Sequence, residues 1–181
     1  MEAHERQSIL DQYQASHERM MALLEKLTPA QWQFRPGSGR WSIAECLEHV
    51  AAVEARVVGN IHKQLAGPPG DPEKLKETAG KDEMLAKLIP DRSNRVEAPE
   101  PVRPTGRWPE VSELLAHYQA TRASTIRFVQ ETADDLRSRS WAHPHFGEMT
   151  CFQWLLAMSH HGDRHAKQIE EIRQHPEYPV V

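Results

Sequence analysis

Residues 150–174, TCFQWLLAMSHHGDRHAKQIEEIRQ, predict one amphipathic helix, and the rest of the chain can be placed around it. The large apolar side chains recur every three or four positions, which puts them on one helical face. Thr150 followed three residues later by Gln153 is a capping box, the signature of a helix N-terminus. His161 and His165 continue the apolar stripe. The stretch therefore predicts a helix that carries two imidazoles on its inward face.

Three more segments have the same helical spacing, at about 3–27, 42–66 and 110–131. The second opens with Ser42 and Glu45, which form another capping box. Strand-like alternation is nearly absent, and the WAHPHFGE segment before the last helix is expected to be a loop. Four long helices with little else predict an all-α protein.

The connection between the second and third helices is long. GPPGDP breaks the second helix, residues 72–89 show a weaker helical pattern, and residues 90–109 contain five prolines. A proline-rich segment of this kind cannot continue a helix and favours an extended chain. We therefore expect a four-helix bundle with a long crossover between helices two and three, forming a single domain over residues 1–181.

The composition excludes several classes of function. The formal net charge is −4 and no cluster of Lys and Arg marks a nucleic-acid surface. No apolar run approaches the roughly 20 residues that span a bilayer, and the acidic N-terminus lacks the apolar region of a signal peptide. Two cysteines are too few for a disulfide framework. We expect a cytoplasmic protein with no nucleic-acid or membrane partner.

The unusual number is eleven histidines, and two of them are spaced for metal binding. His161 and His165 are four apart on the predicted helix, so their Cβ atoms lie about 5–6 Å from each other. Their ring nitrogens can converge on one ion at about 2.0–2.1 Å each. His160 lies about 100° round the helix and should be less buried. A pair of this kind is more often incidental than metal-binding, so the interpretation needs a third ligand.

His49 is the candidate third ligand. It lies two turns into the second helix, and it would meet the 161/165 pair if the second and fourth helices adjoin. Alone it would be a histidine of the core. Glu45 lies one turn earlier on the same side, where it could accept a hydrogen bond from His49 or act as a catalytic base. Its capping role already accounts for it, so Glu45 is only a candidate catalytic residue.

Two other classes of metal site do not match the sequence. A zincin needs Glu directly after the first histidine, and that position is Gly162. A di-iron carboxylate bundle needs Glu-x-x-His, and no Glu in the chain has His three residues later. A mononuclear three-histidine site remains, with a coordination position left for water or substrate.

The fragments RPGSGRWSIAECLEHV, HPHFGEMTCFQWL and HHGDRHAKQI occur in this order, and with them the chain resembles the DinB-like (DinB/YfiT-like) family of bacterial four-helix bundles. The resemblance implies a divalent metal, most often zinc or nickel, bound by a histidine of the second helix and an H-x-x-x-H pair of the fourth. The matching positions are His49, His161 and His165. This family is distinct from the DNA polymerase that shares its name.

For the reaction, the resemblance implies less: its characterised members include metal-dependent transferases and isomerases that use a low-molecular-weight thiol of the bacillithiol or mycothiol type. A transferase that activates such a thiol on a small-molecule substrate is therefore the leading expectation. A bound cation stabilises a thiolate, which is the attacking form. The same cation lowers the pKa of bound water toward 7, so a metal-dependent hydrolase is the alternative. The rival outside the enzyme class is a non-catalytic bundle that binds a metal or a ligand.

Two further expectations concern the surroundings of the site and the association of the chain. Gln168 could hydrogen-bond within the site, although a polar residue at its rim is the simpler interpretation. Arg122 could face an anionic group of the substrate. Leu85, Leu88 and Ile89 in the weak middle helix would be exposed apolar residues that could serve a homodimer.

Overall fold

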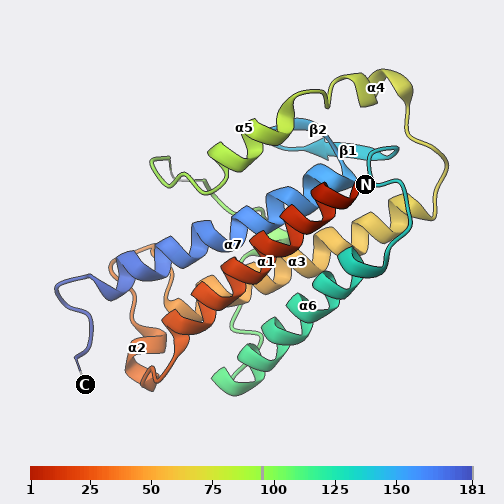
Figure 1. Ribbon diagram of the computed structural model, residues 1–181. Coiled ribbons are helices and arrows are strands. Elements are labelled where there is room, and N and C mark those ends of the chain that lie inside the picture. The colour runs from red at the N-terminus through yellow and green to blue at the C-terminus, as the bar shows by residue number, and fades with distance from the viewer. Residues whose placement is uncertain (95, 181) are drawn as a thin grey trace.

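Four long helices pack side by side in the computed structural model, which describes residues 1–94 and 96–180 (Figure 1). They are α1 (Ala3–Leu24), α3 (Ile43–Leu65), α6 (Val111–Glu131) and α7 (Cys151–Arg173). α1 packs against α6 and α7, and α3 packs against the same two helices. The expected all-α four-helix bundle is confirmed, and the second and fourth long helices, α3 and α7, are neighbours.

The helices run in two directions. α1 and α7 run the same way, and α3 and α6 run the opposite way (Figure 1). Because α3 and α6 are parallel, the chain must return along the bundle between them, as a long crossover does. The residues that join α3 to α6 therefore pass along the outside of the bundle.

Capping boxes begin α3 and α7 as predicted. They form at Ser42 with Glu45 for α3, and at Thr150 with Gln153 for α7. In each, the hydroxyl accepts the backbone N–H of the partner, and the partner side chain accepts the backbone N–H of the cap. A similar box begins the short helix α2 (Pro29–Gln33). These contacts satisfy N–H groups that the first helical turn leaves free.

The crossover contains three short helices, α4 (Pro72–Lys76), α5 (Lys81–Leu88) and the 3₁₀ helix η1 (Glu100–Val102). Gly80, with φ of +72°, separates α4 from α5, so the weak helical stretch is two helices. α5 packs on α7 and buries Leu85 and Ile89, whereas Leu88 stays 45% exposed. The expectation that all three apolar residues are exposed was therefore wrong for two of them, because α5 covers part of the bundle.

A short hairpin replaces the expected loop before α7. Strands β1 (Ser140–His143) and β2 (Gly147–Thr150) pair antiparallel, with Trp141 opposite Met149. The turn between them is three residues long and is followed by Gly147 at φ of +65°, a common hairpin geometry. Trp141 stacks on Trp154 of α7, with ring centroids 4.6 Å apart. Strands of four residues are too short for alternation to stand out in the sequence.

The core has two hydrophobic clusters, one toward each end of the bundle. Each long helix contributes to both clusters, and on each helix polar residues separate the two contributions. They include Ser16 on α1, Glu54 on α3 and Arg122 on α6, all buried. The corresponding stretch of α7 is His161-Gly162 with His165. The predicted metal ligands of α7 therefore lie at the polar middle of the bundle.

The long helices are amphipathic, with buried positions on one side and exposed polar positions on the other. In the described part of the chain, no helix combines the length and the hydropathy that crossing a membrane requires.

Candidate metal centre

His161 and His165 project from successive turns of α7 and bring two ring nitrogens together. Their Nε2 atoms are 3.1 Å apart. Two nitrogens that each lie about 2.0–2.1 Å from one ion are roughly 3.3 Å apart at the tetrahedral angle. The pair is therefore spaced as two ligands of one ion would be.

His49 of α3 meets this pair, as expected from the sequence. Its ring centroid lies 5.1 Å from that of His161 and 4.9 Å from that of His165. One ring nitrogen from each of the three histidines lies within 4.8 Å of the others. His49 and His165 are buried and His161 is half-buried. His160, also half-buried, is not part of this group.

A backbone carbonyl sets the tautomer of His49. The Nδ1 atom of His49 lies 2.7 Å from the carbonyl oxygen of Val102, in η1. A carbonyl can only accept, so Nδ1 carries the proton and Nε2 keeps its lone pair. Metal-binding histidines are commonly oriented by a hydrogen bond of this kind from the second ring nitrogen.

The side chain of Gln168 does the same for His165. The Oε1 atom of Gln168 lies 3.0 Å from His165 Nδ1 and also accepts from Arg92 Nη1 at 3.3 Å. Arginine has only donors, so the amide oxygen must face it. His165 therefore donates through Nδ1 and keeps the lone pair on Nε2. Gln168 belongs to the site, beyond the role of rim residue that the sequence favoured.

The histidines are held in the neutral form that binds metals. Burial lowers the pKa of His49 and places the pKa values of His161 and His165 well below the usual value of 6.5. Neighbouring rings of the group further depress the pKa values of His161 and His165 through the repulsion of like charges. Protons therefore compete weakly with a cation for these nitrogens.

The chemistry of the donor set fits a divalent transition metal. Three neutral imidazoles suit zinc or nickel and do not suit calcium or magnesium, which prefer oxygen. Three protein ligands leave a coordination position free for another molecule. The three-histidine group can therefore hold one ion with an open position.

Glu45, the candidate base, is engaged elsewhere. Its carboxylate accepts two hydrogen bonds from Arg35, at 2.8 and 2.7 Å, and one from the backbone N–H of Ser42. Bonds to Arg35 and Ser42 outweigh partial burial and lower the pKa of Glu45. To act as a base, the carboxylate would have to leave Arg35.

Arg122 is part of the core and does not face a substrate group. It pairs with Glu54 at 2.9 Å, and its side chain is 1% exposed. It also donates to Ser16 Oγ and to the carbonyl of Tyr13. In the sequence Arg122 was one candidate partner for an anionic group of the substrate, but in the structure its partner is Glu54 of the chain itself. A Cβ on Gly162 would lie 3.3 Å from both Arg122 Nη2 and Ser16 Oγ.

The crossover closes over the centre and is held on both sides. Glu48, next to His49, accepts the backbone N–H groups of Thr105 at 2.9 Å and Gly106 at 3.0 Å. Arg164 of α7 donates to the carbonyls of Ile89, Asp91 and Asn94. The segment that supplies the Val102 carbonyl is thus fixed to the two helices that supply the histidines.

Sequence reasoning missed the roles of Val102, Arg92, Glu48 and Trp41. The indole of Trp41 lies 4.8 Å from the ring of His49 and stacks on His165 at 6.1 Å, measured between centroids. Every residue has a backbone carbonyl, so the sequence does not show that the one of Val102 accepts from His49. The sequence shows only that Glu48 is a charged residue next to His49, and its burial appears only in the structure.

Comparisons with known proteins agree with this architecture. A family model described as the DinB superfamily matches residues 12–169. Uncharacterized protein YuaE of Bacillus subtilis (strain 168) is 25% identical over 151 residues, which cover 83% of this chain and 88% of YuaE. The crystal structure of TT2238, a four-helix bundle protein, superposes with a TM-score of 0.58 at 22% identity, covering 92% of this chain and 98% of TT2238. At that identity the structural likeness shows the fold alone.

Proposed function

The chain belongs to the DinB superfamily, and because it also brings three histidines together we propose that it is a divalent-metal-dependent transferase that activates a low-molecular-weight thiol. The observation that carries the proposal is the convergence of His49, His161 and His165, with Nδ1 of two of the rings already committed to acceptors. Zinc and nickel are the ions that this donor set suits best.

The chain's own groups account for binding and orientation. Val102 and Gln168 hold the rings of His49 and His165 so that Nε2 faces the centre. The crossover and Trp41 cover the rings and limit the access of water. When bound, a divalent cation supplies a Lewis acid that favours the thiolate form of a thiol at its open position.

The first test is the metal content. Protein purified without a metal-affinity tag should contain close to one zinc or nickel ion per chain by elemental analysis, as three converging imidazoles require. Metal-free protein should take up one equivalent again. A chain that contains no metal and cannot be loaded would remove the basis of the proposal.

The adjacent histidines of α7 provide a matched pair of variants. His161→Ala removes a proposed ligand and should weaken zinc binding by several orders of magnitude, whereas His160→Ala should leave it within about threefold, since His160 lies outside the group. Competition titrations against a chromophoric chelator measure both variants. Equal effects would mean that the ligand assignment is wrong.

The reaction is tested by screening thiols and electrophiles with metal-loaded and chelated protein. The proposal expects turnover that needs both the metal and the thiol. Metal-dependent hydrolysis of esters or amides without a thiol would replace the transferase by a hydrolase. Loss of folding on chelation, with no turnover of any kind, would favour a non-catalytic bundle in which the metal is structural.

A further inference from the structure

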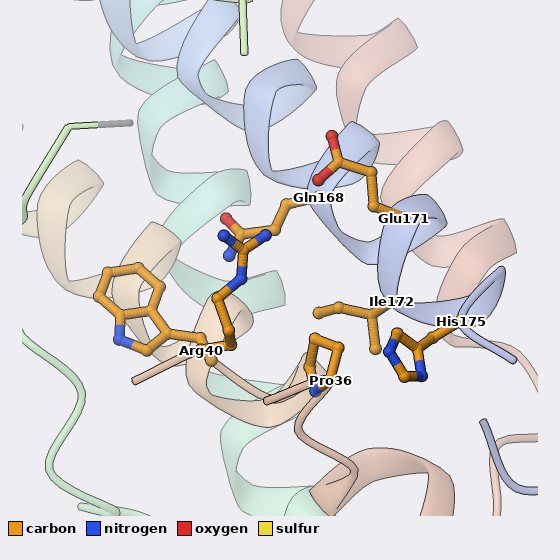
Figure 2. A pocket seen from close by; sticks show the side chains of 7 residues that line it. Pro36, Arg40, Gln168, Glu171, Ile172 and His175 are labelled. Atoms are coloured by element: carbon orange, nitrogen blue, oxygen red, sulfur yellow. The ribbon is translucent and has the colours of Figure 1, made fainter. Parts of the chain in front are cut away.

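A cavity of about 300 Å³ lies beside the histidine group, where the loop before α3 meets the C-terminal part of α7 (Figure 2). Pro36, Trp41 and Ile172 give it apolar walls, and Arg40, Gln168 and Glu171 give it polar ones. In Figure 2, the Arg40 side chain extends along the cavity toward Gln168 and Glu171. The volume is at the lower end of the range of small-molecule sites, about 300–1,000 Å³.

The charged side chains in and beside the cavity, Arg40 and Arg92 against Glu171, add up to a net charge of +1. Both oxygens of Glu171 accept from Arg92, at 2.7 Å each, so this carboxylate is neutralised. The amide oxygen of Gln168 is occupied by Arg92 and His165. Within residues 1–94 and 96–180, the guanidinium of Arg40 makes no direct hydrogen bond or salt bridge, although its charge helps Arg92 to lower the pKa of Glu171. The free donors of the cavity therefore favour an anion.

We propose that this cavity binds a small organic carboxylate. The planar fork of Arg40 matches a carboxylate with two parallel N–H···O bonds. Trp41 and Ile172 offer apolar surface to the hydrocarbon part of the same molecule. A neutral ligand of equal shape would form no ion pair with the guanidinium and should bind more weakly.

The bound acid lies one layer of side chains away from the histidines. Trp41 and Gln168 line the cavity with one face and contact the histidine rings with another. The proposal needs neither a metal nor a thiol, so it can fail or succeed separately from the proposed function.

The test is an NMR titration of metal-free protein with butyrate and benzoate, and with the neutral amides butyramide and benzamide. Both acids should bind saturably and shift the Trp41 indole and Gln168 amide signals, and the amides should bind at least about tenfold more weakly. Arg40→Gln should lower the affinity for the acids about tenfold. Arg56→Gln removes an exposed charge from the outer face of α3 and should change nothing.

Three results would overturn the proposal: no saturable binding of either acid, equal affinity for acids and amides, or undiminished binding by a folded Arg40→Gln variant. Arg40 is exposed, so its replacement is expected to leave the unfolding transition unchanged. If the unfolding transition of the variant is shifted, the comparison of acids with amides on the wild-type protein still tests the proposal.

Discussion

The amide of Gln168 joins the histidine group to the crossover, because one oxygen accepts from both His165 and Arg92. Gln168→Leu keeps the size of the side chain and removes this acceptor, so His165 can rotate or change tautomer. Loss of such an outer contact typically weakens metal binding by about 10–100-fold. Zinc competition titrations should show this loss, whereas Gln130→Leu on the exposed face of α6 should bind zinc as the wild type does. Equal affinities would mean that Gln168 does not orient the ligand.

Two helix-interior glycines form a matched pair with opposite expected effects. Gly59→Ala adds a Cβ to open space and should stabilise the protein by about 0.5–1 kcal/mol through helix propensity. Gly162→Ala gains the same propensity but places its Cβ 3.3 Å from Arg122 Nη2 and Ser16 Oγ. Arg122 is held by Glu54 and cannot yield easily, so a net destabilisation of about 1 kcal/mol is expected. Urea unfolding measures both, and stabilisation by Gly162→Ala would show that the polar middle is loosely packed.

Among individual residues, the sequence predicted the three histidines and missed the groups that hydrogen-bond to them. His161 and His165 could be found because helical periodicity places them on the apolar stripe. The hydrogen-bond partner of His49 is a backbone carbonyl more than fifty residues away, so no pattern of side chains predicts it. The crowding at Gly162 comes from Arg122 on another helix, which periodicity within one helix does not reveal.

Among the elements, the crossover depends on specific anchors because it has little regular structure. Glu48→Ala leaves the backbone N–H groups of Thr105 and Gly106 without their acceptor, which should cost about 1–3 kcal/mol of unfolding free energy. Hydrogen exchange at these two amides should accelerate. The exchange rates of amides in the middle of α3 and α6 should change by no more than the overall loss of unfolding free energy accounts for. Glu131→Ala, at the exposed end of α6, serves as the control. Unchanged exchange at Thr105 and Gly106 would show that Glu48 does not hold the crossover.

The long helices were predictable because their boundaries are encoded locally. The boxes at Ser42 and Thr150 begin α3 and α7 where the sequence placed them. The hairpin was not predictable because its strands have only four residues each, and the burial of α5 was not predictable because it depends on α7, which lies much later in the chain. Local capping determines where a helix starts, and tertiary packing determines which short segments become ordered on it.

For the whole molecule, the bundle is two apolar clusters separated by a polar middle, which contains the Arg122–Glu54 ion pair and the two histidines of α7 that His49 meets from α3. Burial of Arg122 with Glu54 is costly unless the pair is intact, so this layer restricts how the four helices can slide past one another. The histidines add a second restriction, because their nitrogens converge only when α3 and α7 are in register. The same layer thus gives the fold its register and the candidate site its geometry.

This layer also predicts how the stability of the metal-free protein depends on pH. The folded pKa values of His49, His161 and His165 are lowered by burial, and the pKa of His143 is lowered to about 4, against the ordinary histidine value of 6.5. Below pH about 6.5 the unfolded chain therefore binds more protons, and the unfolding free energy should fall between pH 6.5 and 5. Glu54, whose pKa is raised, opposes this trend as a single group. Urea titrations at pH 7.5, 6.5, 5.5 and 5 should show the decline, and the double variant His161→Gln with His165→Gln should reduce its slope. A stability that stays level over this range, or an unchanged slope in the double variant, would mean that the histidines are not buried in the neutral form.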